Sequence, residues 1–287
     1  MDIINLSSTS FFQKAFDILG ISQDAFARLV NKSPARISRY LSGSEVVPDA
    51  VFAFAMDALS ARMLDPSSLF PLSDEADYYY HATTMEIVFP IDVHWNDGGY
   101  NDFGNGFYLG ESFRQAITWG KESSPTSIYC FHKSKFRKAK EYVFSNALDW
   151  LFYVGLNRGK VLSMAYPEYE TSLKKAIARY DVIKGSIADS FSFNVIELLF
   201  AGRFDVDQAE AATVIMALGN QRVIKSQEFA SSLLPDRLIK LDKTLSRYFL
   251  YYGQKAQHGF DALISGLLEK SPNEERKFAR LAGKWHG

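Results

Sequence analysis

The chain has very little of what marks a secreted or membrane protein. It contains a single cysteine, Cys130, which excludes a disulfide framework and suits a reducing compartment. It has no apolar run near the ~18 residues that a membrane-spanning helix needs. Its first residues lack both the basic and the apolar segments of a signal peptide. We therefore expect a cytoplasmic protein with no membrane partner.

An excess of charge is also missing. Lys and Arg number 32 against 33 Asp and Glu, so the formal net charge is −1 and any affinity for nucleic acid needs a local patch. No histidine shows metal-ligand spacing with Cys130 or with carboxylates, so no metal site is expected. What the chain does have is a hydrophobic share of 47% over 287 residues. This composition and length predict a globular protein with more than one folding unit.

Residues 10–62 read as a series of short helices with clear start and stop signals. The first helix ends at Gly20, and Ser22 can cap the second. Ser33 can cap a third helix whose first position is Pro34, where the missing amide hydrogen is harmless. Pro48 opens a fourth helix with an apolar face. We expect an all-α N-terminal domain.

Residues 21–29 and 33–43 resemble the paired helices of phage-repressor-like helix-turn-helix domains. The resemblance implies that the helix from Ser33 is the recognition helix, and that DNA binding falls to Lys32, Ser33, Arg36 and Arg39. Residues 1–62 hold six basic and six acidic side chains, however, so the domain is not basic overall. Domains of this kind also serve in dimerisation or protein docking, and the sequence leaves both uses open.

Turn-forming residues at 65–68 and 71–75 predict a domain boundary. Beyond it, strand signals at 78–81, 107–109 and 127–131 alternate with helical signals at 112–120 and 147–156, without a regular βαβ repeat. Helical patterns at 245–252 and 260–268 follow, as a packing extension. We expect an α+β fold in three consecutive parts, with a helix-turn-helix domain at 1–70, an α+β domain at 71–235 and a helical C-terminal extension at 236–287.

Several short segments of the α+β region follow one another in a recognisable order. They are 80–83 (Tyr-His-Ala-Thr), 102–109 (Asp-Phe-Gly-Asn-Gly-Phe-Tyr-Leu), 147–151 (Ala-Leu-Asp-Trp-Leu) with Asn157-Arg158, 180–189 (Tyr-Asp-Val-Ile-Lys-Gly-Ser-Ile-Ala-Asp), and 220–223 (Asn-Gln-Arg-Val) with Ser226. In this order they resemble a bacterial ADP-ribosyltransferase-like family of unknown function, whose members read Tyr-His-Gly-Ser and then Asp-Phe-Gly-x-Gly-Phe-Tyr. The resemblance covers about residues 78–232.

The resemblance implies a site for nicotinamide adenine dinucleotide (NAD) as ADP-ribose donor, and no metal. His81 would hydrogen-bond a ribose hydroxyl, Tyr108 would stack on the nicotinamide, and Gln221 would take the third catalytic position. Residues 97–100 (Asp-Gly-Gly-Tyr) would form a flexible lid over the donor. The donor-binding residues would be His81, Ala82, Thr83, Gly104, Gly106, Phe107, Tyr108 and Asp189.

The sequence departs from the resembled family at Ala82 and Gly110, whereas Gln221 follows that family and differs only from the wider group of ADP-ribosyltransferases. Gln221 stands where many ADP-ribosyltransferases have Glu, so it can hydrogen-bond a hydroxyl but carries no charge. Ala82 replaces a Gly and Gly110 replaces a Thr. Taken singly, His81 and Tyr108 also fit ordinary packing roles in a strand.

The predicted function is ADP-ribosyl transfer to a macromolecule, protein or nucleic acid, in a toxin or defence role. Partners would be DNA through the N-terminal domain, and an antitoxin or a second copy of the chain. The alternatives are a non-catalytic, nucleotide-sensing transcription regulator and an NAD glycohydrolase.

Overall fold

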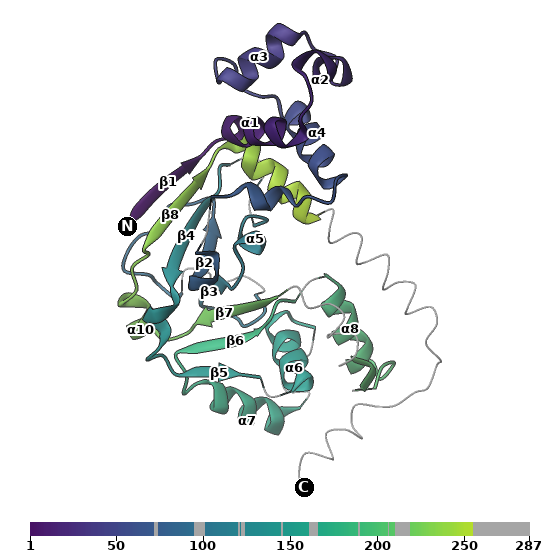
Figure 1. Cartoon of the computed structure of the whole chain (residues 1–287). Helices are drawn as coiled ribbons and strands as arrows, with labels where there is room; N and C mark the ends of the chain where they lie inside the picture. Colours follow the sequence, from purple (N-terminus) through teal and green to yellow (C-terminus); the bar gives the residue numbers. More distant parts are fainter. Residues whose placement is uncertain are drawn as a thin grey trace. The chain divides into compact units, whose positions relative to one another are not determined.

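The computed structural model shows a mixed α/β protein and describes residues 1–71, 74–94, 101–119, 121, 124–144, 146–160, 166–188, 190–205, 207–209 and 219–254 (Figure 1). The chain forms two compact units, each assembled from segments distant in sequence. The first unit comprises residues 1–86, 112–132 and 235–255, and the second comprises 87–111, 133–234 and 256–287. None of the helices described is long and apolar enough to cross a bilayer.

The first unit includes four helices at the positions that the sequence predicts. They are α1 (Ser8–Leu19), α2 (Gln23–Leu29), α3 (Pro34–Ser42) and α4 (Asp49–Ser60). The side chains of Ser22 and Ser33 accept hydrogen bonds from the third N–H of the helix that each one caps. Gly20 ends α1 in the left-handed conformation, with φ 60°. The predicted helix starts and stops are therefore confirmed.

Four strands of the first unit lie in the order β1–β8–β4–β2. Their bounds are β1 (Asp2–Leu6), β8 (Arg237–Leu241), β4 (Ser127–His132) and β2 (Tyr78–Thr83). β1 runs parallel to β8, whereas β8 and β2 are antiparallel to β4. The short helix α5 (Phe113–Ala116), the 3₁₀ turns η1 (Pro66–Leu69) and η2 (Glu75–Asp77), and a helical segment at 243–254 complete the unit.

Strands β1 and β8 correct two expectations. The N-terminal region is not all-α, and the segment from 236 onward is not purely helical, because Asp2 pairs with Arg237 and Leu6 with Leu241. A five-residue edge strand whose partner lies at the other end of the chain leaves little periodic signal in the sequence. The predicted helix at 245–252 is present within 243–254, and the one at 260–268 lies outside the described residues. The two interleaved units replace the three consecutive parts expected.

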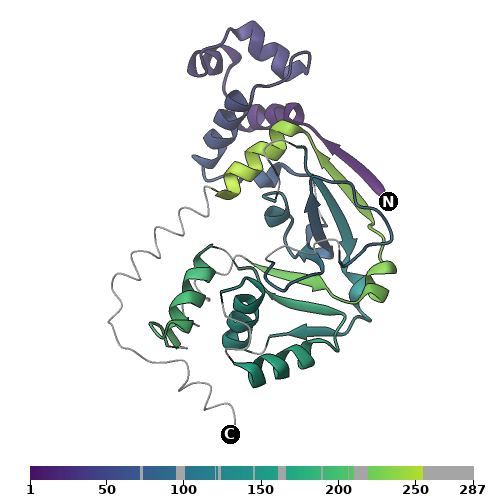
Figure 2. The ribbon, with the colours of Figure 1, turned by 180° about the vertical axis from the view of Figure 1, so that it is seen from behind.

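The second unit holds strands in the order β3–β7–β6–β5, namely β3 (Phe107–Gly110), β7 (Asn220–Ile224), β6 (Val182–Ser186) and β5 (Glu141–Val143). Helices α6 (Ala147–Asn157), α7 (Pro167–Ile177) and α8 (Ser190–Phe200) follow the strands, with η3 (Lys133–Phe136) and α10 (Gln227–Ser231). Both views show α6 and α7 beside β5 and β6 (Figures 1 and 2). Their apolar faces share one core with Phe103, Ile183 and Val223.

Candidate functional site

The carboxylate of Asp102 is the centre of a buried polar network in the second unit. The residue is 3% exposed. Its Oδ1 accepts from Nε and Nη2 of Arg158 at 2.8 and 2.6 Å. Its Oδ2 accepts from the backbone N–H of Ala188 at 3.0 Å and from Nε2 of Gln221 at 2.6 Å. Four donors on one carboxylate satisfy the acceptor capacity that a buried charge requires.

Asp102 and its three partner residues come from four separate segments of the sequence. Asp102 opens the glycine-containing segment, and Arg158 is the C-cap residue of α6. Ala188 follows β6, and Gln221 lies on β7. All four segments are ones that the sequence singles out, and the structure brings them to one carboxylate.

Gln221 is buried and fully engaged through its amide nitrogen. It is 2% exposed, and Nε2 also lies 3.4 Å from the carbonyl of Ser186, which accepts from the Trp150 indole at 3.0 Å. The amide therefore fixes β7 to the Asp102 carboxylate. This contact accounts for a Gln at the position, because a Glu there would place a second carboxylate against Asp102.

Tyr108, the predicted nicotinamide-stacking residue, holds the turn that precedes it. Its hydroxyl accepts from the N–H of Phe103 at 3.0 Å and donates to the carbonyl of Gly104 at 2.7 Å. Burial raises the pKa of this phenol, so the hydroxyl stays neutral and acts as both donor and acceptor. The ring is half-buried against the core of the unit. Its orientation is therefore set by the turn on one side and the core on the other.

Lys225 binds the same turn from the end of β7. Its ammonium donates to the carbonyl of Phe103 at 2.9 Å and to the carbonyl of Asn105. Burial lowers the pKa of this lysine to about 8. Among the residues that the structure describes, no carboxylate forms an ion pair with it. The turn is thus bound at both ends, by Asp102 and Tyr108 and by Lys225.

Gly104 and Gly106 are explained by close packing within the protein. A Cβ on Gly104, which has φ 70°, would lie 2.7 Å from Oδ1 of Asn157. A Cβ on Gly106 would lie 2.4 Å from Cγ1 of Val223. The sequence predicts these glycines as points where a ligand approaches the backbone. The structure shows that the approaching groups are side chains of α6 and β7.

The predicted residues His81, Ala82 and Thr83 lie at the end of β2 and belong to the first unit. All three are half-buried and pair in register with Tyr129, Ile128 and Ser127 of β4. The hydroxyl of Thr83 accepts from the N–H of Met85 at 3.0 Å, which closes the turn after the strand. His81 is thus on a different unit from Tyr108 and Gln221.

The predicted DNA-contacting residues extend from Lys32, just before α3, to Arg39 in its last turn. Arg36 and Arg39 share a face, as expected, but both are bound by Glu45. Glu45 lies 2.7 Å from Nη2 of Arg36 and 3.0 Å from Nε of Arg39. Ser33 is occupied as the cap of α3, and Lys32 is exposed. The basic face is therefore partly neutralised from within.

Other predictions lie elsewhere. Asp189 and the predicted lid at 97–100 are outside the described residues. Cys130 is buried, as predicted, and burial raises the pKa of its thiol to about 12. Within the described part of the chain, no cluster of His, Cys, Asp or Glu could hold a metal ion.

Three central residues were not predicted as site residues, namely Asp102, Arg158 and Lys225. Asp102 and Arg158 belong to the segments that carry the family resemblance, but the sequence analysis gives them no role. The signal that could have identified them is a charged residue at the edge of an apolar segment. Nothing in the sequence around Lys225 distinguishes it from a surface lysine. Its role depends on the end of β7 lying beside a turn about 120 residues earlier in the chain.

Comparison with known proteins gives one match. No curated protein and no solved structure matches the chain. A family described as "protein of unknown function (DUF3990)" matches residues 78–234, which is more than half of the 287 residues. The matched region begins with β2 and ends after α10, so it includes every partner of Asp102. The chain belongs to this family of unknown function, DUF3990.

Proposed function

We propose that this protein is an NAD-dependent ADP-ribosyltransferase that modifies a macromolecule. One observation carries the proposal: four of the five segments on which the transferase resemblance rests meet at the Asp102 carboxylate. Such a convergence builds a preorganised turn, and sites that act on a ligand need their groups fixed before binding.

The reaction would break the N-glycosidic bond between nicotinamide and ribose. Nicotinamide leaves with the bonding electron pair, positive charge develops on the ribose, and a nucleophile of the acceptor bonds to the anomeric carbon and loses its proton. His81 is proposed to hydrogen-bond a ribose hydroxyl. Tyr108 is proposed to present its ring to the nicotinamide, since its hydroxyl is occupied by Phe103 and Gly104.

Gln221 takes a different role in this proposal from the one that its sequence position suggests. Because its amide donates to Asp102 and it is 2% exposed, we assign it to positioning the turn. The other donor-binding candidates remain Ala82, Thr83, Gly104, Gly106, Phe107 and Asp189. Gly104 and Gly106 would act by allowing the turn to pack against α6 and β7.

The biological setting proposed is a toxin or defence effector. The N-terminal helices would bind DNA or dock a protein, such as an antitoxin or a second copy of the chain. The Glu45 ion pairs with Arg36 and Arg39 favour docking over DNA binding, because they reduce the positive charge that phosphates need.

A second candidate function is nucleotide sensing without chemistry by a transcription regulator. The observation that favours it is the uncharged and buried Gln221, which leaves the usual carboxylate of this transferase position absent. A third, NAD hydrolysis, differs only in using water as acceptor.

The proposal is tested with NAD labelled in the adenylate moiety, incubated with purified protein and cell lysate. We expect label on a macromolecule with the wild type, and loss of labelling by about 100-fold or more with His81→Ala. His94→Ala is the matched control, because His94 is exposed and outside the proposed site. Release of nicotinamide without labelling would indicate hydrolysis, and tight NAD binding without release would indicate a sensor. Full labelling by His81→Ala would contradict the proposed site.

A further inference from the structure

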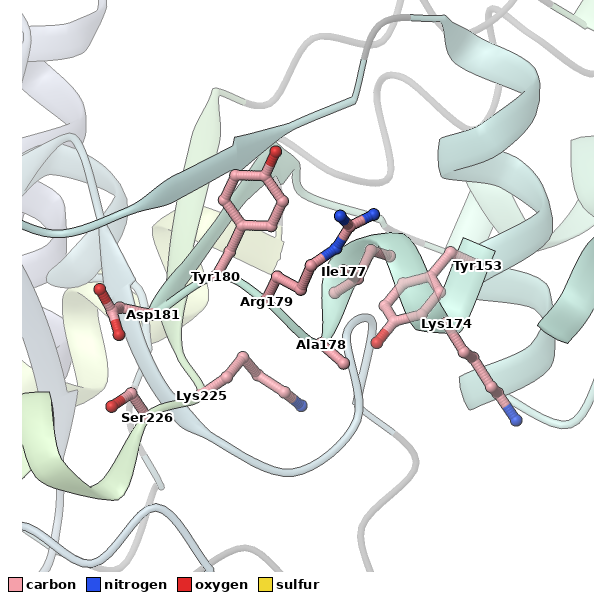
Figure 3. A pocket seen from close by; sticks show the side chains of 9 residues that line it. All are labelled: Tyr153, Lys174, Ile177, Ala178, Arg179, Tyr180, Asp181, Lys225 and Ser226. Atoms are coloured by element: carbon pink, nitrogen blue, oxygen red, sulfur yellow. The ribbon is translucent and has the colours of Figure 1, made fainter. Parts of the chain in front are cut away.

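A pocket of about 510 Å³ opens in the second unit, where the end of α7 meets the end of β7 (Figure 3). Its volume lies in the range of small-molecule sites. The residues that matter for its chemistry are Tyr153, Lys174, Arg179, Tyr180, Asp181 and Lys225. None of them belongs to the residues assigned above to the NAD donor, so the pocket needs its own explanation.

Two of the three cations in the lining lack a carboxylate partner. Lys174 is paired with Glu170 at 2.6 Å, and its amine points away from the other pocket side chains (Figure 3). Arg179 and Lys225 form no ion pair with any residue in the described part of the chain. Both side chains line the pocket, with the guanidinium of Arg179 and the ammonium of Lys225 at different heights in the view, while the carboxylate of Asp181 points to the opposite side (Figure 3). The pocket therefore gathers two uncompensated positive charges.

The ammonium of Lys225 has one N–H group without an acceptor among the described residues. A lysine ammonium carries three N–H groups, and two of them are used by the carbonyls of Phe103 and Asn105. The group is half-buried, and burial lowers its pKa to about 8 because the ammonium loses contact with water. An anion that reached the third N–H would supply the missing charge.

The negative groups nearby do not cancel this excess. The Asp181 carboxylate accepts from the N–H of Lys140 at 2.9 Å, on the side away from Arg179. The carbonyls at the end of α7 contribute about half a negative charge. The two full positive charges exceed the sum of the Asp181 charge and that partial charge, so an anion is favoured.

We propose that this pocket binds a small phosphate monoester, with Arg179 and Lys225 contacting the phosphate and Tyr180 contacting the organic part. A phosphate dianion matches two positive charges and offers three oxygens to a guanidinium fork and an ammonium, whereas a carboxylate offers one charge and two oxygens. The ring of Tyr180 makes an edge contact with Tyr142, at 5.3 Å between ring centroids, and the 36% of the residue that stays exposed at the pocket can contact a base or sugar.

The test is a calorimetric titration of the full chain with adenosine 5′-monophosphate and, separately, with inorganic phosphate. We expect both to bind, and Arg179→Gln and Lys225→Met each to weaken binding about tenfold or more. Tyr180→Ala is expected to weaken binding of the nucleotide and leave inorganic phosphate unchanged. Lys175→Met and Arg203→Gln are matched controls, since both residues are exposed on the same unit and lie outside the pocket lining. The controls should change neither affinity more than about twofold.

Two outcomes would overturn the proposal. One is the absence of binding by either probe to the wild type at millimolar concentration. The other is binding that Arg179→Gln and Lys225→Met leave unchanged. Arg179 is exposed and forms no hydrogen bond within the described part of the chain, so we expect Arg179→Gln to keep the fold even if Lys225→Met loosens the turn. The titration measures phosphate binding and not nicotinamide release. Its result therefore does not depend on whether the protein has the proposed transferase activity.

Discussion

The N-terminal helices and the turn at 102–108 are stabilised in opposite ways. Each boundary between α1 and α4 is set by a neighbour in sequence: Ser22 and Ser33 cap by accepting from an N–H three residues on, and Gly20 ends α1 with a left-handed conformation. The turn depends instead on partners far along the chain, since Arg158, Gln221 and Lys225 lie 56, 119 and 122 residues from the groups that they contact. Local signals thus build the helices, and long-range polar contacts build the candidate site.

Substitution of Asp102 should break this comparison most strongly. Asp102→Ala leaves Arg158 without its carboxylate and leaves the donors of Gln221 and Ala188 unpaired. We expect a loss of about 3–5 kcal/mol from the second unit. Hydrogen exchange measured by peptide would show the loss at 102–108 and β7. Unchanged protection there would mean that the network does not hold the turn.

The matched change in the helical region should be smaller. Ser33→Ala removes the side-chain cap of α3 and is expected to cost about 1 kcal/mol. The same exchange experiment should show increased exchange confined to the first turn of α3. Effects of equal size for Ser33→Ala and Asp102→Ala would erase the distinction between local and long-range stabilisation.

Gly106, which packs against β7, and Gly20, which ends α1 without a close neighbour, offer a second pair of substitutions to compare. Gly106→Ala places a methyl group 2.4 Å from Cγ1 of Val223 and 2.8 Å from the carbonyl of Ile224, so we expect a loss of about 1–3 kcal/mol. Gly20→Ala meets no atom within 4 Å and suffers only from its φ of 60°, which costs about 1 kcal/mol. Denaturation midpoints of the two variants measure the difference, and a larger effect at Gly20 would contradict the packing argument.

Lys225 predicts a pH dependence for the second unit. Because its pKa is lowered to about 8 in the folded protein, the unfolded chain holds a proton that the folded chain releases between pH 8 and about 10.4. The free energy of unfolding should therefore rise with pH in that window, by at most about 1.4 kcal/mol per pH unit. Below pH 8 the buried charge destabilises the folded protein to its full extent. The neighbouring ionisable groups, Tyr153, Arg179 and Asp181, remain in both proteins compared. Unfolding of wild type and Lys225→Met across this range gives the difference, and parallel curves would show that Lys225 does not titrate there.

The smallest effect on stability is expected at Glu45. Glu45→Gln releases Arg36 and Arg39 from exposed ion pairs, so the melting temperature should not change measurably. Nonspecific DNA binding should strengthen and become more dependent on salt, because two positive charges are freed. A fluorescence-anisotropy titration at two salt concentrations measures this. Equal binding by both proteins would favour protein docking as the role of α3.

The features that the sequence predicts are those set by local signals, and the features that it misses depend on long-range contacts. The helices α1 to α4, the strands β2, β3 and β4, and the buried Cys130 are predicted because capping residues and apolar periodicity are local signals. Strand β1 and the interleaving of the units are missed because they depend on pairing with β8 at residues 237–241. The motifs that contain Asp102 and Arg158 can be recognised in the sequence. Their convergence, and the turn-binding role of Lys225, require the fold.

The proposed activity is tested most directly by nicotinamide release from NAD, measured by chromatography with purified wild type, His81→Ala and His94→Ala. The account predicts release by the wild type and by His94→Ala, and a loss of about 100-fold or more in His81→Ala. No release by the folded wild type, with or without cell lysate, would contradict the transferase proposal and leave nucleotide sensing as the function.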